Sequence, residues 1–309
     1  MRMINTGSVI VDQVIRLPKM PEPGGDVIAN STELVAGGGL NSMLGAARYG
    51  MKVVYCGLVG TGPFADIIGQ ALEKDGISSI FPRVPDADNG YCVAFVEDSA
   101  ERTFVTTLGV EGDFGYEHLA AIQLEPGDLI YISGYSLATE SNAVGLAKWL
   151  AEIPADIPVV VDPSPLISEL PRELYAPLLA RADIWSCNER EAEILGESGS
   201  DAANAAAIKK LLKKDAAVVV RAGNDSTVVI TGAGEVVEVP TFPTVVRDTN
   251  GAGDTHVGVM MAALAEGHDL VEAVRRGNAA AAIMISRPGP NTAPQQEEIN
   301  RVLAGAPIA

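Results

Sequence analysis

The chain has 309 residues, of which 47% are hydrophobic and 20% charged, so it can bury a sizeable core. Its formal net charge of −18 argues against nucleic-acid binding, because proteins that hold phosphate backbones usually present a basic face. No stretch is apolar for long enough to span a membrane, and we expect no targeting leader. Three widely spaced cysteines without metal-like pairing favour free thiols in the cytoplasm: Cys56, Cys92 and Cys187.

Strand-like and helix-like segments alternate along the chain. The first expected elements are a strand over Met3–Val11, a helix over Asn41–Tyr49, a strand over Lys52–Val59 and a helix over Phe64–Asp75. Further strands are expected at Leu129–Ser133, Val159–Asp162, Ile184–Ser186, Ala217–Arg221 and Thr227–Thr231. This alternation predicts an α/β fold with a mostly parallel central sheet and helices on both faces.

Two regions interrupt the alternation. Pro18–Leu34 is rich in Pro and Gly and then extended, and Tyr91–Leu108 reads as two strands that turn at Asp98–Glu101. Strands without intervening helices predict a small β-sheet beside the main sheet. We therefore expect one domain over residues 1–309, with a β lid formed from about residues 12–35 and 90–110. Such a lid could close a cleft or join two copies of the chain in a homodimer.

The segment Asp248–Asp254, with the sequence DTNGAGD, is the most informative one. The apolar stripe between Val257 and Leu264 predicts that a helix begins at this segment. Small residues let the backbone approach an anion, and the first N–H groups of a helix have no partner within it. The segment therefore predicts a phosphate site, where Asp254 could accept the proton of an attacking hydroxyl. Alternatively, Asp254 only favours the helix dipole and the glycines serve a tight turn.

Two other phosphate motifs do not occur in the sequence. The P-loop pattern GxxxxGK[ST] is missing, and Gly57–Gly62 has the wrong glycine order for the dinucleotide pattern GxGxxG. A dinucleotide-dependent oxidoreductase is therefore a distant alternative.

Four segments, taken in order, resemble those of the ribokinase-like (PfkB) family of carbohydrate and nucleoside kinases. They are Gly37–Gly50, Glu101–Thr103, Asn188–Glu191 and Asp248–Asp254. The resemblance runs from about Ile4 to Ile299. It implies a ribokinase-like fold and transfer of the γ-phosphoryl group of ATP to a hydroxyl of a sugar, most simply a hydroxymethyl group. It also implies Mg²⁺ as a cofactor.

The resemblance implies a role for each matched position. The sugar would contact Asp12, Gly37, Gly38 and Asn41. The transferring phosphoryl group would meet Gly251, Ala252 and Gly253, with Asp254 as the catalytic base. ATP would lie against Asn188, Glu191, Arg221, Gly223, Gly251 and Gly253, with Glu191 organising Mg²⁺ through water. Asp248 and Asn250 align with positions that bind a monovalent cation such as K⁺ in some members.

Several of these residues also have a plain structural interpretation. Asp12 could cap a turn, and Asn188 could cap a helix together with Glu191. His256 stands where an apolar residue is usual in the family, and could contact substrate, tune Asp254 or serve the core. The turn Arg221–Ser226 has fewer glycines than in many members, which leaves its contacts with the nucleotide open.

Two other functions remain open on the same fold. A nucleoside kinase would need a base pocket in the lid, for which Tyr91, Phe95 and Phe104 are candidates. A non-catalytic sugar-binding regulator would bind sugar without forming ADP. These motifs do not define the acceptor, because specificity depends on the geometry of the pocket.

Overall fold

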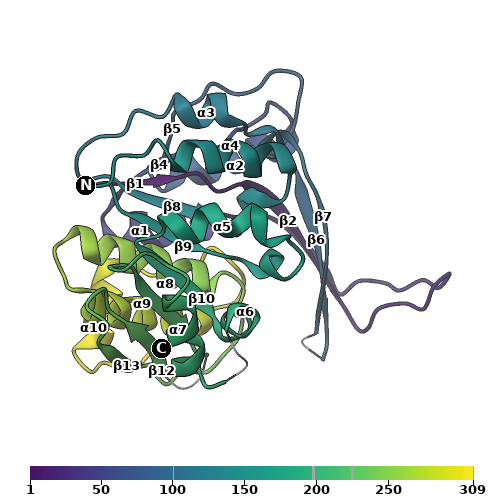
Figure 1. Ribbon diagram of the computed structural model, residues 1–309. Coiled ribbons are helices and arrows are strands. Elements are labelled where there is room, and N and C mark those ends of the chain that lie inside the picture. The colour runs from purple at the N-terminus through teal and green to yellow at the C-terminus, as the bar shows by residue number, and fades with distance from the viewer. Residues whose placement is uncertain (100, 197–198, 224–225, 309) are drawn as a thin grey trace.

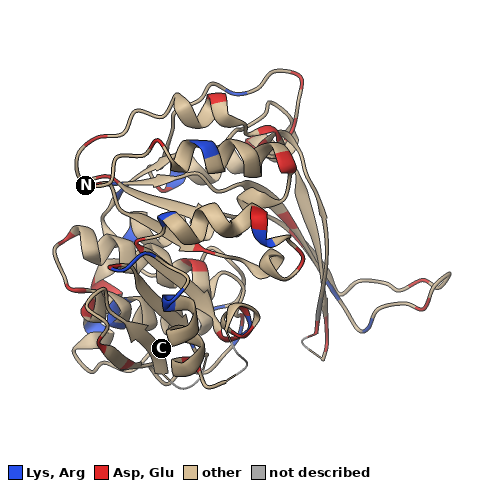
Figure 2. Cartoon of the chain, in the orientation of Figure 1, with Lys and Arg blue, Asp and Glu red and all other residues tan. Residues whose placement is uncertain are grey.

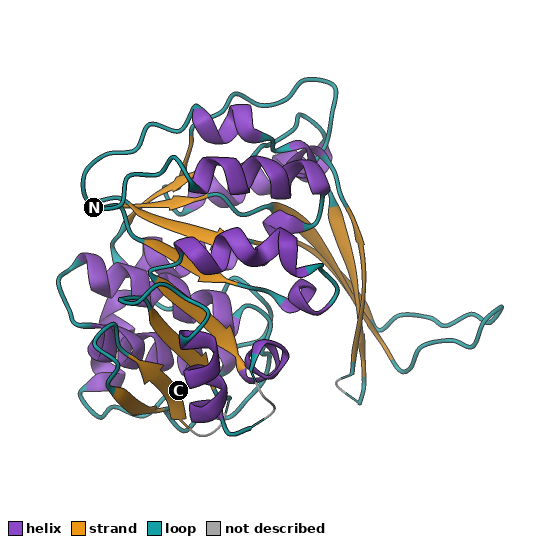
Figure 3. Cartoon of the chain, viewed as in Figure 1, coloured by secondary structure: helices purple, strands orange, loops and turns teal. Residues whose placement is uncertain are grey.

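In the computed structural model, nine strands form a single sheet in the order β13-β12-β11-β10-β9-β8-β1-β4-β5 (Figures 1 and 3). The structure describes residues 1–99, 101–196, 199–223 and 226–308. The strands of this sheet are β1 (Arg2–Asn5), β4 (Lys52–Tyr55), β5 (Ser78–Ser79), β8 (Leu129–Ser133), β9 (Val159–Asp162), β10 (Ile184–Asn188), β11 (Ala217–Arg221), β12 (Ser226–Ile230) and β13 (Val236–Pro240). Only β12 runs antiparallel to its neighbours, β11 and β13, which confirms the prediction of a mostly parallel sheet.

Helices cover both faces of this sheet, as predicted. The helices are α1 (Leu40–Tyr49), α2 (Pro63–Lys74), α3 (Tyr116–Ala120), α4 (Glu140–Leu150), α5 (Arg172–Arg181), α6 (Glu189–Leu195), α7 (Asp201–Lys209), α8 (Ala252–Ala265), α9 (Leu270–Ile285) and α10 (Gln296–Leu303). Short 3₁₀ turns lie at Val110–Asp113, Gly134–Leu137 and Pro165–Ser168. Alternate strand residues enter two separate cores, as Met3 and Ile4 of β1 do. Helices α1, α2, α8, α9 and α10 pack on one core, and α3 to α7 on the other.

A second sheet of four strands, in the order β3-β2-β6-β7, extends to one side of the first (Figure 1). Its strands are β2 (Val9–Leu17), β3 (Ser31–Gly38), β6 (Tyr91–Glu97) and β7 (Arg102–Thr107). The two strands expected within Tyr91–Leu108 are confirmed, although their predicted turn includes residue 100, outside the described residues. We call this sheet the lid.

The single strand predicted over Met3–Val11 is wrong, because the chain leaves the main sheet after Asn5 and enters the lid at Val9. The Gly7 N–H donates a hydrogen bond of 2.8 Å to Asn5 Oδ1, which turns the chain at this point. Asp12 consequently lies in the lid rather than at the end of a strand of the main sheet. The strand predicted over Lys52–Val59 also ends earlier, at Tyr55.

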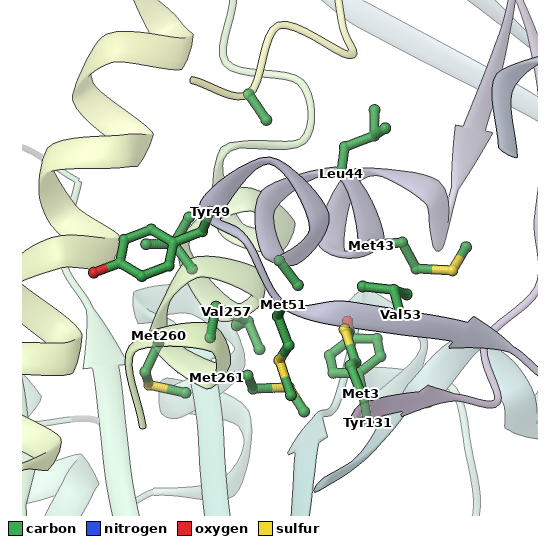
Figure 4. Packing of buried hydrophobic residues seen from close by; sticks show 14 of the residues in the cluster. Met3, Met43, Leu44, Tyr49, Met51, Val53, Tyr131, Val257, Met260 and Met261 are labelled. Carbon is green, nitrogen blue, oxygen red and sulfur yellow. The ribbon is translucent and has the colours of Figure 1, made fainter. Parts of the chain in front are cut away.

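Helices α1 and α8 cross at backbone contact distance, which brings distant parts of the sequence together. A Cβ atom on Gly258 would lie 2.0 Å from the Ser42 carbonyl oxygen, and one on Gly45 would lie 2.8 Å from that of Thr255. Figure 4 shows the apolar side chains packed around this crossing. The first turn of α1 is thereby held beside the first turn of α8.

Acidic residues are spread over helices and loops across the whole molecule (Figure 2), so charge alone does not locate a site. Within the described part of the chain, the helices are too short or too polar to pass through a bilayer. All three cysteines are free thiols, as predicted, and all three are buried.

Candidate active site

Three polar residues stand at the carboxyl ends of neighbouring parallel strands. Asp162 ends β9, Asn188 ends β10 and Arg221 ends β11. Since β10 pairs in parallel with both β9 and β11, these three ends meet at one edge of the sheet. Ligands of open α/β sheets bind outside this edge. The fold therefore places the candidate site here.

The start of α8 faces the same edge and needs glycine at Gly251. This residue caps the helix with φ of 82°, a left-handed conformation that glycine adopts at little cost. A Cβ atom at Gly251 would also lie only 2.7 Å from Cγ of Asn41. The N–H of Ala252 donates to the Thr249 carbonyl oxygen at 3.3 Å, so the N–H groups of Gly253 and Asp254 are the ones that an anion at the helix start could use.

Arg221 ties the strand ends to the start of α8. Its Nη1 donates to Asp162 Oδ2 at 3.0 Å and to Ser186 Oγ at 3.1 Å. The same nitrogen lies 3.4 Å from the Gly253 carbonyl oxygen in the first turn of α8. Its Nη2 lies 3.9 Å from Glu191 Oε2. A single buried guanidinium therefore positions the helix start relative to two carboxylates.

Asp254, in the first turn of α8, is half-buried among other charges. Burial and repulsion by Asp162 raise the pKa of Asp254, Arg221 opposes both effects, and the net pKa is about 7. The carboxylate of Asp12 acts on it as well. Asp254 thus feels charges from both the strand ends and the lid, and its pKa suits a general base near neutral pH.

In the lid, Asp12 of β2 pairs with Val35 of β3, and its carboxylate lies against the neighbouring Gly37. A Cβ atom on Gly37 would be 2.2 Å from Asp12 Oδ2, so any side chain there would displace the carboxylate. Burial raises the pKa of Asp12 to about 6, and a hydrogen bond from Asn250 opposes the rise. Gly37 therefore makes room for the Asp12 carboxylate.

Asn41, in the first turn of α1, is buried beside Gly251. Its Oδ1 accepts a hydrogen bond of 3.4 Å from the N–H of Asn291, and Asn291 Nδ2 donates to the Ala36 carbonyl at 2.7 Å. Asn291 has φ of 61°, in the left-handed region. Sequence reasoning missed Asn291, which joins the C-terminal part of the chain to the N-terminal glycine block.

Asp248 and Asn250 precede α8 and connect it to the lid. The N–H of Asn250 donates to Asp248 Oδ1 at 2.9 Å. Arg16 of β2 places its Nη2 3.6 Å from Asp248 Oδ2. A guanidinium therefore already lies beside the carboxylate that the resemblance assigns to a monovalent cation.

A cavity of about 300 Å³ opens beside the first turn of α8. Its lining includes Asn188, Arg221, Gly223 and Gly253 from the strand ends and the start of α8. It also includes the apolar residues Phe242, Val246, Ala281, Ala282 and Ile285. The size and the mixed lining suit a small ligand with one anionic and one flat apolar part.

Glu191 differs from the other predicted site residues, since its side chain serves its own helix. Glu191 Oε2 accepts the Asn188 N–H at 2.9 Å, and Asn188 Oδ1 accepts the Glu191 N–H at 2.8 Å. The structural interpretation of this pair as a capping box is therefore confirmed. Glu191 is only 3% exposed, so few of its atoms can reach a ligand. Asp162, which sequence reasoning treated only as the end of a strand, stands closer to Arg221.

A family model for pfkB family carbohydrate kinases matches residues 4–297. The chain belongs to the pfkB family of carbohydrate kinases. As a family member it is a phosphotransferase with an alcohol group as acceptor, and the predicted resemblance is confirmed.

Similar proteins in this family include both sugar and nucleoside kinases. The uncharacterized sugar kinase YegV of Escherichia coli is 32% identical over 95% of this chain and 91% of its own length. Adenosine kinase of Saccharomyces cerevisiae is 29% identical over 91% of this chain and 83% of its own. The structure of Arabidopsis thaliana ribokinase with ribose and ATP has a TM-score of 0.77 at 20% identity and covers 99% of both chains. This last likeness establishes the ribokinase-like fold.

Proposed function

We propose that this pfkB family member transfers the γ-phosphoryl group of ATP to a sugar hydroxyl, with Asp254 as the base. The observation that carries the proposal is the place of Asp254. It stands in the first turn of α8 directly after Gly253, which lines the cavity together with Arg221, and the Asp12 carboxylate of the lid is near enough to act on its charge. A sugar hydroxyl held by the lid would then lie next to the Asp254 carboxylate and to a phosphoryl group bound at the start of α8.

The nucleotide would occupy the 300 Å³ cavity with its phosphates toward Gly253 and Arg221. The helix start and the guanidinium would stabilise negative charge on the transferring group. Mg²⁺ would neutralise the phosphate oxygens. Among the described residues, no three His, Cys, Asp or Glu side chains cluster closely enough to hold a metal ion. This fits an ion held mainly by phosphate and water, with Glu191 contributing through water.

The sugar would lie between the lid and the first turn of α1. Asp12 and the side-chain amide of Asn41 would offer acceptors and a donor for hydroxyl groups, and Gly37 and Gly38 would line the same site, where Gly37 leaves room for the Asp12 carboxylate. Closure of the lid would exclude water, which otherwise competes with the sugar as acceptor. Monovalent-cation activation through Asp248 and Asn250 has less support, because Arg16 lies beside Asp248.

A nucleoside acceptor is the second candidate. The strand register of the lid leaves one of the three candidate aromatic side chains on the same face as Asp12. Asp12 pairs with Cys92, and Ala94 pairs with Phe104, so Phe104 lies on the same face as Asp12. Phe104 is 55% exposed and could stack on a base. Tyr91 and Phe95 belong to the opposite face, and Tyr91 packs against Phe64 at 5.2 Å between ring centroids.

The test is a screen for ADP formation over pentoses, hexoses, polyols and nucleosides, with Mg²⁺ and with or without K⁺. We expect sustained turnover with at least one free sugar, and little ADP without an acceptor. Turnover with nucleosides alone would select the second candidate. Sugar binding by calorimetry without ADP formation would favour a non-catalytic regulator and contradict the proposal.

We also propose that two lids pair in a homodimer in the cytoplasm. Leu34 of β3 and Val105 of β7 are 48% and 56% exposed, and both strands are edges of the lid. Exposed edge strands readily pair with another chain unless they are covered. Three buried thiols fit a reducing compartment. Sedimentation velocity measures the oligomeric state directly.

A further inference from the structure

Glu111 is a buried carboxylate that the proposed chemistry does not use. It lies in the 3₁₀ turn Val110–Asp113, just after β7, and is 3% exposed. Its Oε2 accepts the N–H of Gly90 at 2.9 Å, and its Oε1 accepts the N–H of Gly109 at 2.8 Å. Gly90 directly precedes β6, and Gly109 follows β7. One side chain therefore holds both ends of the β6–β7 hairpin of the lid (Figure 1).

The two glycines at the ends of this hairpin are in contact with each other. A Cβ atom on Gly90 would lie 2.2 Å from the Thr107 carbonyl oxygen and 2.8 Å from the Gly109 nitrogen. A Cβ atom on Gly109 would lie 2.3 Å from the Gly90 nitrogen. No residue larger than glycine therefore fits at either position, and the Glu111 carboxylate holds the two chain segments together.

The neighbouring Asn89 connects the hairpin to the strand that carries Asp12. Asn89 is 3% exposed, and its Nδ2 lies 3.4 Å from Glu111 Oε2. The same nitrogen donates to the carbonyl oxygens of Val9, at 3.2 Å, and of Leu58, at 3.1 Å. Because Val9 begins β2, three of the four lid strands start or end at one buried cluster. We call this cluster the lid root, and it consists of Asn89, Gly90, Gly109 and Glu111.

The lid root determines where Asp12 lies. Asp12 follows Val9 closely in β2, and it pairs with Cys92, which follows Gly90 closely in β6. The Asp12 carboxylate is near enough to act on the charge of Asp254 in α8. Catalytic groups must be held within about 0.5 Å of their productive positions, and a displacement of about 1 Å can cost about a hundredfold in rate. The geometry of the lid root should therefore matter to the reaction.

We propose that Glu111 is a positioning residue for phosphoryl transfer, and that its hydrogen bonds at the lid root fix Asp12 relative to Asp254. This inference rests on the proposed function, because it requires a sugar between the lid and α8. A carboxylate suits two converging N–H groups, because both of its oxygens accept hydrogen bonds and neither donates. A side-chain amide at the same place would direct one donor at another.

Glu111→Gln keeps the size of the side chain and replaces one oxygen by an NH₂ group. In either orientation of the amide, this group faces the N–H of Gly90 or of Gly109, so the lid root should loosen. We expect kcat/KM for the best sugar from the screen to fall about 10- to 100-fold, with a raised KM for the sugar. ADP formed without acceptor should rise relative to sugar-dependent turnover, because a displaced lid admits water. Calorimetric binding of ADP with Mg²⁺ should be unchanged, because the residues that line the nucleotide cavity lie outside the lid.

Two further variants separate positioning from stability. Glu111→Asp keeps both oxygens on a shorter side chain and should fall between the wild type and Glu111→Gln in kcat/KM. Asp128 is a matched buried carboxylate, since it is 1% exposed and accepts a hydrogen bond of 2.8 Å from Arg2 Nε. It precedes β8, at the opposite end of that strand from the site. Asp128→Asn should therefore lower the melting temperature and leave kcat/KM for the sugar unchanged.

Amide hydrogen exchange without ligand tests the lid root itself, because β6 and β7 should exchange faster in Glu111→Gln than in the wild type. Unchanged exchange in these strands would overturn the inference. So would a Glu111→Gln variant that melts lower but keeps the wild-type kcat/KM for the sugar, or one that loses sugar turnover and ADP binding equally. A wild type that phosphorylates no sugar would instead contradict the proposed function.

Discussion

Asp254→Asn should lower kcat by about 10² to 10⁴, the usual contribution of a general base, and leave the KM values for ATP and sugar within a few-fold. The amide has nearly the same shape as the carboxylate but cannot accept the proton of the hydroxyl. Steady-state kinetics with the best acceptor from the screen, together with calorimetric binding of sugar and ADP, measures both parts of the prediction.

Stability provides an internal control for Asp254→Asn. In the wild type, the pKa of Asp254 is about 7 in the folded state and lies above the ordinary value of 3.8. Between pH 3.8 and pH 7 the folded state therefore binds more protons than the unfolded state. Stability is therefore lost as pH rises through this window, and the penalty is complete above pH 7. Asp254→Asn removes the penalty and should melt above the wild type at pH 8. A variant with lower melting temperature and normal kcat would assign Asp254 to the helix dipole alone.

A matched variant tests the dipole interpretation separately. Asp66 also lies in the first turn of a helix, α2, but its side chain is 56% exposed, pairs with Arg83 at 2.7 Å and does not line the cavity. Asp66→Asn should change stability by about 0.3–1 kcal/mol at most and leave kcat unchanged. The comparison separates a first-turn carboxylate in general from the one at the site.

Arg221→Met should destabilise the fold by about 3–5 kcal/mol, the cost of removing one partner from a buried ion pair. The side chain of Arg221 is only 12% exposed, and its loss leaves the Asp162 and Glu191 carboxylates without their cation. Since Arg221 also lowers the pKa of Asp254, the variant should need a higher pH for activity. Denaturant unfolding and the pH profile of kcat/KM measure the two effects.

Two further variants separate charge from geometry at Arg221. Arg221→Lys keeps the charge but loses the fork that reaches Asp162, Ser186 and Gly253 at once, so it should fall between wild type and Arg221→Met. Adding Asp162→Leu to Arg221→Met removes an unpaired buried carboxylate and should recover part of the stability without the activity. Additive losses in the double variant would show that the pair does not interact as described.

The sequence predicted those parts of the molecule that depend on local pattern. The apolar stripe after Asp254 located the start of α8, and the alternation of strands and helices gave the layered α/β fold. The sequence showed the two glycine-containing segments because a left-handed φ or close backbone contact favours glycine, as at Gly251. These two segments lie side by side in the fold, because α1 and α8 cross at Gly45 and Gly258.

The remaining parts depend on contacts between distant segments. The polar residues Asn5–Ser8 interrupt the apolar residues between Met3 and Val11, but the pairing of β2 with β3 and β6 is what shows that the chain changes sheets there. Asp162 was recognisable only as a charged residue ending a buried strand, and its partner Arg221 is 59 residues away. Asn291 had no motif, and its role follows from a contact with Asn41 across 250 residues.

The account depends most on an ionised Asp254 that takes the proton of the acceptor. The most direct measurement is the pH dependence of kcat/KM for the sugar, which reports groups of the free enzyme. Because the base must be deprotonated, kcat/KM should rise tenfold per pH unit up to about pH 7, the pKa of Asp254, and then level off. This rising limb should be absent from the residual activity of Asp254→Asn. A wild-type profile that is flat between pH 5 and 8, or the same limb in Asp254→Asn, would contradict the assignment of Asp254 as the base.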